Sequence, residues 1–155
     1  PIFQLFKRPY KVVTNFERNM GANISALHEK NGSPPPKTSG VLTTKKGQVI
    51  AFHSSSKWKT HFEATKQTPK LIVIDFTASW CGPCKFIQPA ITEFAEKYTD
   101  VEFIKIDVDE LDEVAQEFGV QAMPTFVLIK KGKEVDKIVG AKKEELQKKI
   151  EKHRF

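Results

Sequence analysis

The sequence predicts an α/β domain in which helices cover both faces of a mixed β-sheet. Segments of strand character alternate with segments of helical spacing, in the order β-α-β-α-β-α-β-β-α. One strand segment, Leu71–Ala78, is apolar and β-branched over most of its length, as expected of a strand buried on both faces. The last two strand candidates are joined by a hairpin turn at Lys130–Lys133. Two right-handed βαβ crossovers followed by this hairpin give parallel and antiparallel strands in one sheet.

The first strand and helix of the domain are expected between residues 49 and 68. Val49–His53 is a short strand candidate, and Ser54–Ser56 supplies N-cap residues for the helix that follows. Pro69 sets the end of that helix. Within it, Trp58, Phe62 and Thr65 recur at helical spacing.

A long helix is expected directly after the buried strand. It opens at Cys81 and runs to about Tyr98, and Pro89 inside it is expected to kink it. We expect its apolar face to be made by Phe86, Ile87, Ala90, Ile91, Phe94 and Ala95. The remaining elements are a strand at Val101–Val108, a short helix at Asp112–Phe118 capped by Gly119, hairpin strands at Thr125–Ile129 and Glu134–Val139, and a closing helix at Lys142–His153.

The N-terminal part has a different composition. Residues 1–48 are predicted to be a flexible basic leader and residues 49–155 the folded domain, because the stretch around Pro34-Pro35-Pro36 cannot bury enough apolar surface to offset the entropy of ordering. Residues 1–50 carry eight basic and two acidic residues, so the whole formal net charge of +6 lies there. The basic charge is therefore no sign that the domain binds nucleic acid.

The cysteine content narrows the chemistry. The chain has two cysteines, Cys81 and Cys84, which enclose too small a loop to restrain the unfolded chain much. A structural zinc site is not expected, since no second pair of Cys or His at ligand spacing accompanies them. No apolar run approaches the roughly 18–20 residues that a membrane span needs. A redox-active pair is the favoured interpretation, with a purely structural disulfide as the weaker alternative.

A Cys-x-x-Cys pair after a buried strand has a direct chemical rationale. Cys81 is expected at a helix N-terminus, where unpaired N–H groups and the helix dipole favour a thiolate. Cys84, one turn later, can attack a mixed disulfide formed at Cys81. Gly82 gives the backbone room, and Pro83 suits the first turn, where a missing N–H costs nothing.

Two further positions are candidates for the same site. Asp75 interrupts the apolar run of the buried strand, so its carboxylate must be buried; we interpret it as a proton acceptor for Cys84 rather than a solvated residue on an edge strand. Pro124 stands just before a strand and is a candidate cis-proline, although an ordinary trans-proline fits the sequence equally well. A cis bond would turn the Met123 backbone toward solvent, where it could pair with an extended substrate segment.

The motifs in combination resemble the thioredoxin family. They are the run from Asp75 to Lys85, Pro89, Asp107-Val108-Asp109 and Ala122-Met123-Pro124-Thr125-Phe126, within a similarity that covers residues 49–155. The resemblance implies a five-stranded mixed sheet with four helices and no bound cofactor beyond the Cys81–Cys84 disulfide. It implies that Cys81 attacks, Cys84 resolves, Asp75 is the buried acid–base group and Pro124 is cis. It further implies that Lys105 lies near Asp75, and that Trp80, Gly82, Pro83, Met123 and Gly140 form the substrate-contact surface.

The residues between the cysteines favour a reductant. Gly82-Pro83 resembles reducing thioredoxins, and the motifs around it look like plant h-type thioredoxins of the second subgroup. The partners implied are disulfide-containing proteins and an NADPH-dependent thioredoxin reductase, with the chain acting as a monomer. A redox-independent binding module and an oxidant or isomerase remain open; survival of function after both cysteines become Ser would favour the first, and a high reduction potential the second.

The leader contains one modification motif. Met20-Gly21-Ala22-Asn23-Ile24-Ser25 fits N-myristoylation at Gly21 if Met20 is the start of translation, which would leave residues 1–19 outside the native protein. One acyl chain gives only weak, reversible membrane binding. We expect a cytoplasmic protein, which acylation of Gly21 would attach weakly to membranes. The alternative is a mitochondrial protein, because the basic residues before Met20 also fit an organellar targeting peptide.

Overall fold

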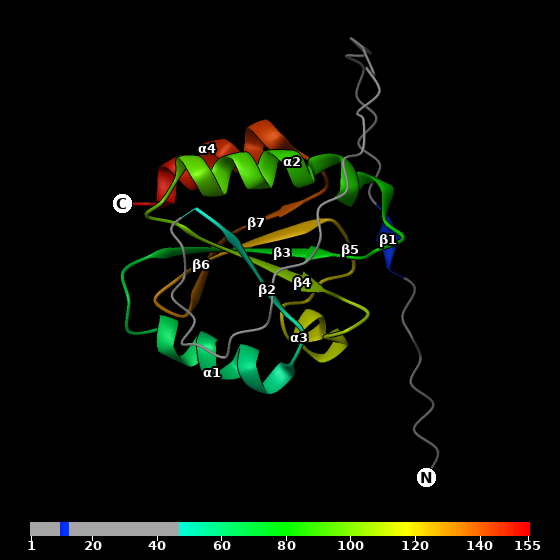
Figure 1. Ribbon diagram of the computed structural model, residues 1–155, viewed down its shortest axis with the longest axis horizontal. Coiled ribbons are helices and arrows are strands. Elements are labelled where there is room, and N and C mark those ends of the chain that lie inside the picture. The colour runs from blue at the N-terminus through cyan, green and yellow to red at the C-terminus, as the bar shows by residue number, and fades with distance from the viewer. Residues whose placement is uncertain (1–9, 13–46) are drawn as a thin grey trace, which may run out of the picture.

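The computed structural model describes residues 10–12 and 47–155, which form the elements drawn in Figure 1. The strands are β1 (Lys11–Val12), β2 (Val49–Phe52), β3 (Leu71–Thr77), β4 (Glu102–Asp107), β5 (Ala122–Met123), β6 (Thr125–Lys130) and β7 (Lys133–Val139). The helices are α1 (Ser55–Thr65), α2 (Gly82–Lys97), α3 (Asp112–Glu117) and α4 (Lys143–His153). From β2 onward the elements follow the expected order and depart from the expected bounds by a few residues at most, apart from the added two-residue strand β5.

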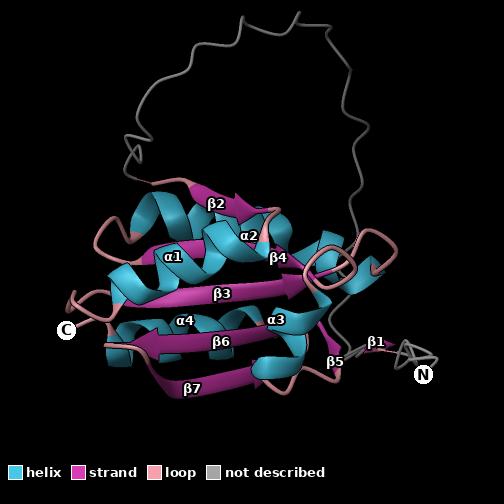
Figure 2. Ribbon diagram, turned by 90° about the horizontal axis from the view of Figure 1, so that it is seen from below, coloured by secondary structure: helices cyan, strands magenta, loops and turns pink. Residues whose placement is uncertain are grey.

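The main sheet has five strands in the order β2-β4-β3-β6-β7, as Figure 2 shows from below. The strands β2, β3 and β4 are parallel to one another, whereas β6 is antiparallel to β3 and β7 is antiparallel to β6. Every residue of the central strand β3 is buried. The predicted mixed sheet is therefore confirmed, and so is the prediction that Leu71–Ala78 forms a strand covered on both faces.

Helices cover the sheet on both faces, with α2 and α4 on one side and α1 and α3 on the other (Figure 1). The alternation of side chains along β3 divides the core accordingly. Ile72 and Ile74 pack with Trp58 of α1, while Leu71 and Val73 pack with the inner faces of α2 and α4. Asp75 stands at the next odd position of β3 and thus lies on the α2 side of the sheet.

The helix α2 corrects one expectation. Phe86 was predicted to lie on its buried face, but this side chain is 83% exposed. The reason is geometric: successive helical residues are about 100° apart, and Ile87, Ile91 and Phe94 already fill the stripe that faces the sheet. Pro89 lies inside α2 and is exposed, and the helix continues across it to Lys97.

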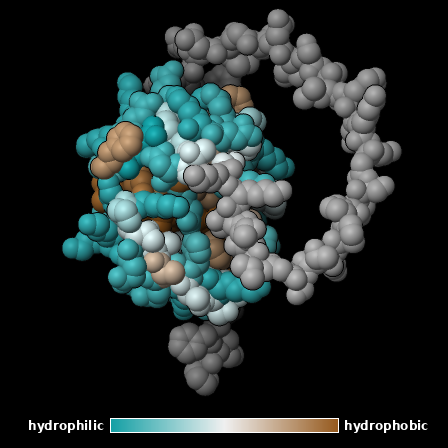
Figure 3. Space-filling model, turned by 60° about the vertical axis from the view of Figure 1, so that its left-hand side comes forward, coloured by the Kyte–Doolittle hydropathy of each residue, from teal (hydrophilic) through white to brown (hydrophobic). Residues whose placement is uncertain are grey.

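Few large apolar side chains are exposed in the described part of the chain. They are Val12, Trp80, Phe86, Val135, Val139 and Phe155. Hydrophilic residues cover most of the face drawn in Figure 3. None of the helices within residues 47–155 has the length and apolar character that a bilayer crossing requires.

The strand β1 lies within the segment predicted as a flexible leader. Lys11 and Val12 pair in parallel with Ala122 and Met123 of β5, forming a two-stranded sheet beside the main one. These residues therefore differ from the leader prediction, because they contact the domain through regular backbone pairing. The rest of the predicted leader up to residue 46, including Gly21, lies outside the described residues.

Candidate functional site

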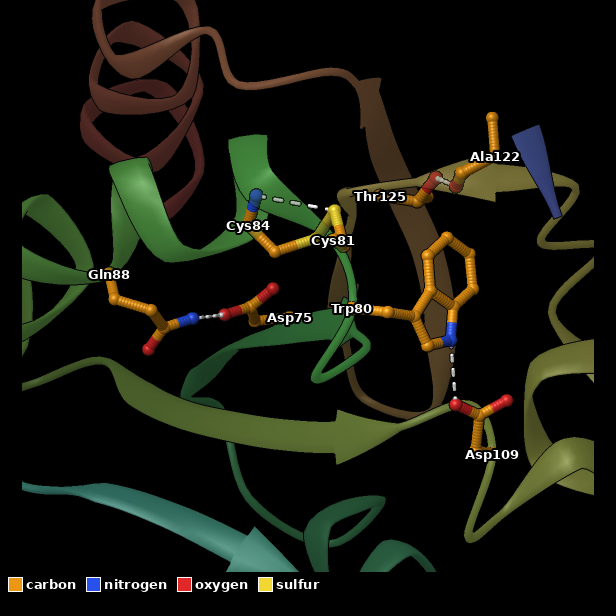
Figure 4. Close-up of a disulfide and its surroundings, with 8 residues drawn as sticks. All are labelled: Asp75, Trp80, Cys81, Cys84, Gln88, Asp109, Ala122 and Thr125. Atoms are coloured by element: carbon orange, nitrogen blue, oxygen red, sulfur yellow. Dashed lines mark hydrogen bonds between the residues drawn. A yellow bond between two sulfur atoms is a disulfide. The ribbon is translucent and has the colours of Figure 1, made fainter. Parts of the chain in front are cut away.

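The disulfide between Cys81 and Cys84 stands at the junction between β3 and α2 (Figure 4). Cys81 is the N-cap of α2, with extended backbone angles, and Pro83 occupies the first turn, as predicted. The Cys84 backbone N–H donates to Cys81 Sγ over 3.3 Å. Both cysteine residues are buried, with exposed fractions of 0% and 1%. The sequence thus places one sulfur at the positive end of a helix and the other one turn inside it.

This position has a consequence for the reduced state. A helix N-terminus offers unpaired N–H groups and a partial positive charge, both of which favour an anion over a neutral thiol. The Cys84 N–H is already aimed at Cys81 Sγ, so a thiolate there would gain a charge-assisted hydrogen bond. The geometry therefore supports Cys81 as the thiol that ionises first.

The carboxyl group of Asp75 lies beneath the disulfide. Figure 4 shows it between Cys84 and Gln88, with one oxygen toward each. Its Oδ2 accepts a hydrogen bond of 2.7 Å from Gln88 Nε2, whereas its Oδ1 is buried and has no hydrogen-bond partner. The residue is only 1% exposed, which confirms that the carboxylate interrupting the apolar strand is buried.

Burial changes the acidity of this group. Desolvation raises the pKa of Asp75 from 3.8 to about 6, while the Gln88 hydrogen bond and the charge of Lys105 act in the opposite direction. Lys105 is the direct neighbour of Asp75 across β3 and β4, so the implied proximity of these two residues is present. A carboxyl group that titrates near pH 6 can both accept and return a proton at neutral pH.

The loop before β6 forms one rim of the site. The Met123–Pro124 peptide bond is cis, which decides between the two alternatives that the sequence left open. The Gly140 N–H donates to Pro124 O over 2.8 Å, and Gly140 has a φ of +104°, a conformation that favours glycine. Thr125 Oγ1 donates to Ala122 O over 2.6 Å. Pro124 and Gly140 are thus held together at the ends of neighbouring strands.

Met123 differs from the expectation at this rim. Its backbone was expected to face solvent, but the residue is 0% exposed and is paired with Val12 of β1. The physical reason is that the open edge of β5 is already used by another strand of the same chain. The backbone of β5 can thus pair with an extended segment, and in this structure β1 is that segment.

The opposite rim is formed by the residues around the cysteines. Trp80 is 49% exposed, and its indole Nε1 donates to Asp109 Oδ2 over 2.8 Å (Figure 4). Gly82 is exposed and Pro83 is half-buried. Pro89 lies on the exposed side of α2, so it touches the site only through the course of the helix.

Two residues of the site were missed by sequence reasoning. Gln88 contacts the buried carboxylate, and Asp109 fixes the indole of Trp80. The spacing gave one usable signal: Gln88 follows Cys84 by four residues on a helix, so the two share a face. Asp109 was noted only as part of a motif. Within residues 10–12 and 47–155, no group of three or more His, Cys, Asp or Glu side chains could hold a metal ion.

The comparisons with known proteins identify this arrangement. The family model described as Thioredoxin matches residues 49–152. The chain belongs to the thioredoxin family. Thioredoxin H2 of Arabidopsis thaliana is 50% identical over 135 residues, which cover 87% of this chain and 99% of that protein. Thioredoxin H-type 1 of Nicotiana tabacum is 55% identical over 113 residues, 73% of this chain and 90% of that protein.

A solved structure supports the same assignment. The crystal structure of thioredoxin NaTrxh from Nicotiana alata has a TM-score of 0.70 and 63% sequence identity, and the match covers 74% of this chain and all of that one. The expected family and fold are therefore confirmed. As a thioredoxin, the chain is a thiol–disulfide oxidoreductase that reduces disulfides in other proteins. Its redox group is its own Cys81–Cys84 disulfide.

Proposed function

We propose that this thioredoxin reduces target disulfides through Cys81 as attacking thiolate, Cys84 as resolving thiol and Asp75 as the group that takes the proton of Cys84. The observation that carries this assignment is the unpartnered Asp75 Oδ1, buried beneath a disulfide at a helix N-terminus. Burial without a partner is costly for a carboxylate, and a proton from the neighbouring thiol relieves that cost.

The steps balance in atoms and electrons. The Cys81 thiolate attacks one sulfur of the target disulfide, forms a mixed disulfide and releases the other target sulfur as a thiolate. Cys84 then gives its proton to Asp75 and attacks Cys81 Sγ, which restores the Cys81–Cys84 disulfide and releases the second target thiolate. The two target thiolates end as thiols, and Asp75 returns its proton to solvent or to the leaving thiolate. The dithiol is oxidised by two electrons and the target disulfide is reduced by two.

The rims bind the target around the reacting sulfurs. Trp80, Gly82 and Pro83 supply contacts on the cysteine side, and Met123, Pro124 and Gly140 supply them on the other, where backbone groups pair with an extended segment. The exposed indole of Trp80 and the shared position of Pro124 and Gly140 support this division. We assign Lys105 and Pro89 to tuning: Lys105 favours the ionised form of Asp75, and Pro89 shapes α2.

The dithiol is regenerated by an NADPH-dependent thioredoxin reductase. This assignment is supported by the Gly82-Pro83 pair and by the similarity to plant h-type thioredoxins. We place the protein in the cytoplasm as a monomer, where it contributes to thiol homeostasis through electron transfer from NADPH. The mitochondrion is the alternative compartment, because the segment before Met20 is basic.

A form of the chain that begins at Gly21 is proposed to be myristoylated there and to associate weakly with membranes. Residues 1–19 would be absent from that form, and with them β1. The support is the motif from Met20 to Ser25, together with an alignment that covers 99% of the Arabidopsis relative but 87% of this chain. Intact-mass measurement of the native protein tests this, and a mass that includes residues 1–19 without an acyl group would contradict it.

Insulin reduction with NADPH and a plant thioredoxin reductase tests the catalytic roles. Replacing Cys81 by Ser should abolish turnover, while Cys84→Ser should accumulate a mixed disulfide with the target that non-reducing electrophoresis detects. Activity that persists after Cys81→Ser would overturn the mechanism. A reduction potential well above about −270 mV, the level of reducing thioredoxins, would favour an oxidant instead.

A further inference from the structure

The strand β1 is fixed to the domain by three kinds of contact. The Lys11 N–H donates to Gln121 O over 3.0 Å, and Lys11 and Val12 lie in register with Ala122 and Met123. Tyr10 packs against the core cluster on the α1 and α3 side of the sheet, and its hydroxyl donates to Asp112 Oδ1 over 2.5 Å. Figure 1 shows β1 beside β5 at the edge of the domain. A three-residue segment is thus held by a backbone ladder at one end and by a side-chain anchor at the other.

The Tyr10 side chain is held at a defined position by Asp112 of α3. Tyr10 and Lys11 line a recess together with residues of α3 and of the segment that follows it, namely Asp112, Gln116, Gly119, Val120, Gln121 and Ala122. Burial and the adjacent Asp112 carboxylate raise the pKa of the Tyr10 phenol, so the phenol stays protonated and remains a donor at working pH. A hydrogen bond to a carboxylate is stronger than one between neutral groups. The Asp112 carboxylate therefore favours a side chain with a hydrogen-bond donor at its tip in the position of Tyr10.

The edge of β5 that pairs with β1 is also the edge to which targets bind under the proposed function. A β-edge accepts one strand at a time, and Val12 is paired with Met123, whose backbone is assigned to target pairing. Met123 and Cys81 are both 0% exposed in this arrangement. A target segment that pairs with Met123 must therefore displace β1.

We propose that Tyr10–Val12 is an intramolecular occupant of the target-binding edge, which competes with target segments and is anchored by the hydrogen bond from Tyr10 to Asp112. The surface fits extended segments that carry a phenol one residue before the pairing strand. This inference rests on the proposed function, since the competition matters only if targets pair at Met123. The apparent target affinity is then the intrinsic affinity multiplied by the fraction of molecules in which the edge is free.

Two variants of the full chain release the segment by different means. Tyr10→Phe keeps the ring and removes the donor to Asp112, whereas Lys11→Pro removes the N–H that bonds to Gln121 O. The matched controls are Tyr98→Phe, which removes a phenol–carboxylate hydrogen bond at the C-terminal end of α2, and Lys11→Ala, which keeps the backbone N–H. Loss of a hydrogen bond to a charged group weakens docking by roughly tenfold.

Two readouts separate the docking from the enzyme function. In insulin reduction, Tyr10→Phe and Lys11→Pro should lower the KM for the target about three- to tenfold at unchanged kcat, and the controls should match the parent chain. Hydrogen exchange should show a protected Lys11 amide in the parent that exchanges several-fold faster in Tyr10→Phe. An unprotected Lys11 amide in the parent, or an unchanged KM in both release variants, overturns the proposal. A parent chain that is inactive on insulin but protects Lys11 refutes the proposed function and leaves the docking established.

Discussion

Replacing Asp75 by Asn should remove a pH-dependent cost from the oxidised protein. The pKa of this carboxyl is about 6 in the folded chain and 3.8 at its ordinary value. Because the folded pKa is the higher one, the native state binds this proton more tightly than the unfolded chain does. Stability from the neutral form is therefore fully present below about pH 4, and it is lost as the pH rises through 6.

The size of the effect follows from the same two pKa values. They differ by a little over two pH units, and each unit corresponds to about 1.4 kcal/mol, so the ionised carboxylate costs roughly 3 kcal/mol above pH 6. The Asp75→Asn variant lacks this titration. Its free energy of unfolding relative to the parent chain should rise by about 2.5 kcal/mol between pH 4 and pH 8.

Urea denaturation of both oxidised proteins at several pH values measures this difference. Any constant effect of the Asn side chain, such as an imperfect hydrogen bond to Gln88, is the same at every pH and cancels in the slope. Glu117→Gln is the matched control, because Glu117 is an exposed carboxylate at the end of α3, and its difference from the parent should stay flat. A difference for Asp75→Asn that is also flat from pH 4 to pH 8 would refute the argument that desolvation governs this group.

Two further predictions concern neighbours of the site. Gln88→Ala removes the donor to Asp75 Oδ2, so the pKa of Asp75 should rise by roughly one pH unit or more. The pH midpoint for resolution of the mixed disulfide should move upward by the same amount. Stopped-flow measurements with a peptide target would show this shift. Gly140→Ala places a Cβ at a φ of +104° and should cost about 1–3 kcal/mol in urea unfolding. It should also raise the KM for protein targets, because Gly140 holds Pro124; an unchanged stability would show that the loop accommodates the side chain.

The fold could be predicted because its signals are local and strong. The β-branched run at Leu71–Ala78, the hairpin turn and the helical spacing each specify an element by the residues within it. Phe86 shows the limit of such patterns. A helical template wide enough to include every apolar residue of α2 also includes one that points to solvent, and only the packing against the sheet decides between them.

The site was predictable where a residue contradicts its surroundings. Asp75 is conspicuous because a carboxylate inside an apolar strand is costly, and the structure places it where that reasoning requires. Asp109 carries no such signal, because an acidic residue in a loop is ordinary. The strand β1 is harder still: it has two residues, and its partner lies about 110 positions away in the sequence, so neither periodicity nor turn chemistry indicates it.

The position of Gln88 follows from the helix that also carries the sulfurs. Cys84 and Gln88 are four residues apart, so they stand on one face of α2, above the strand that carries Asp75. Gln88 bonds to Oδ2, whereas Oδ1 has no hydrogen-bond partner and points toward the cysteines (Figure 4). Gln88 can hold the carboxyl group in place while Oδ1 gains and loses a proton. A single rigid helix thus fixes both the thiol and the orientation of its base, which makes Gln88 a positioning residue whose removal should move the pH profile before it lowers the maximal rate.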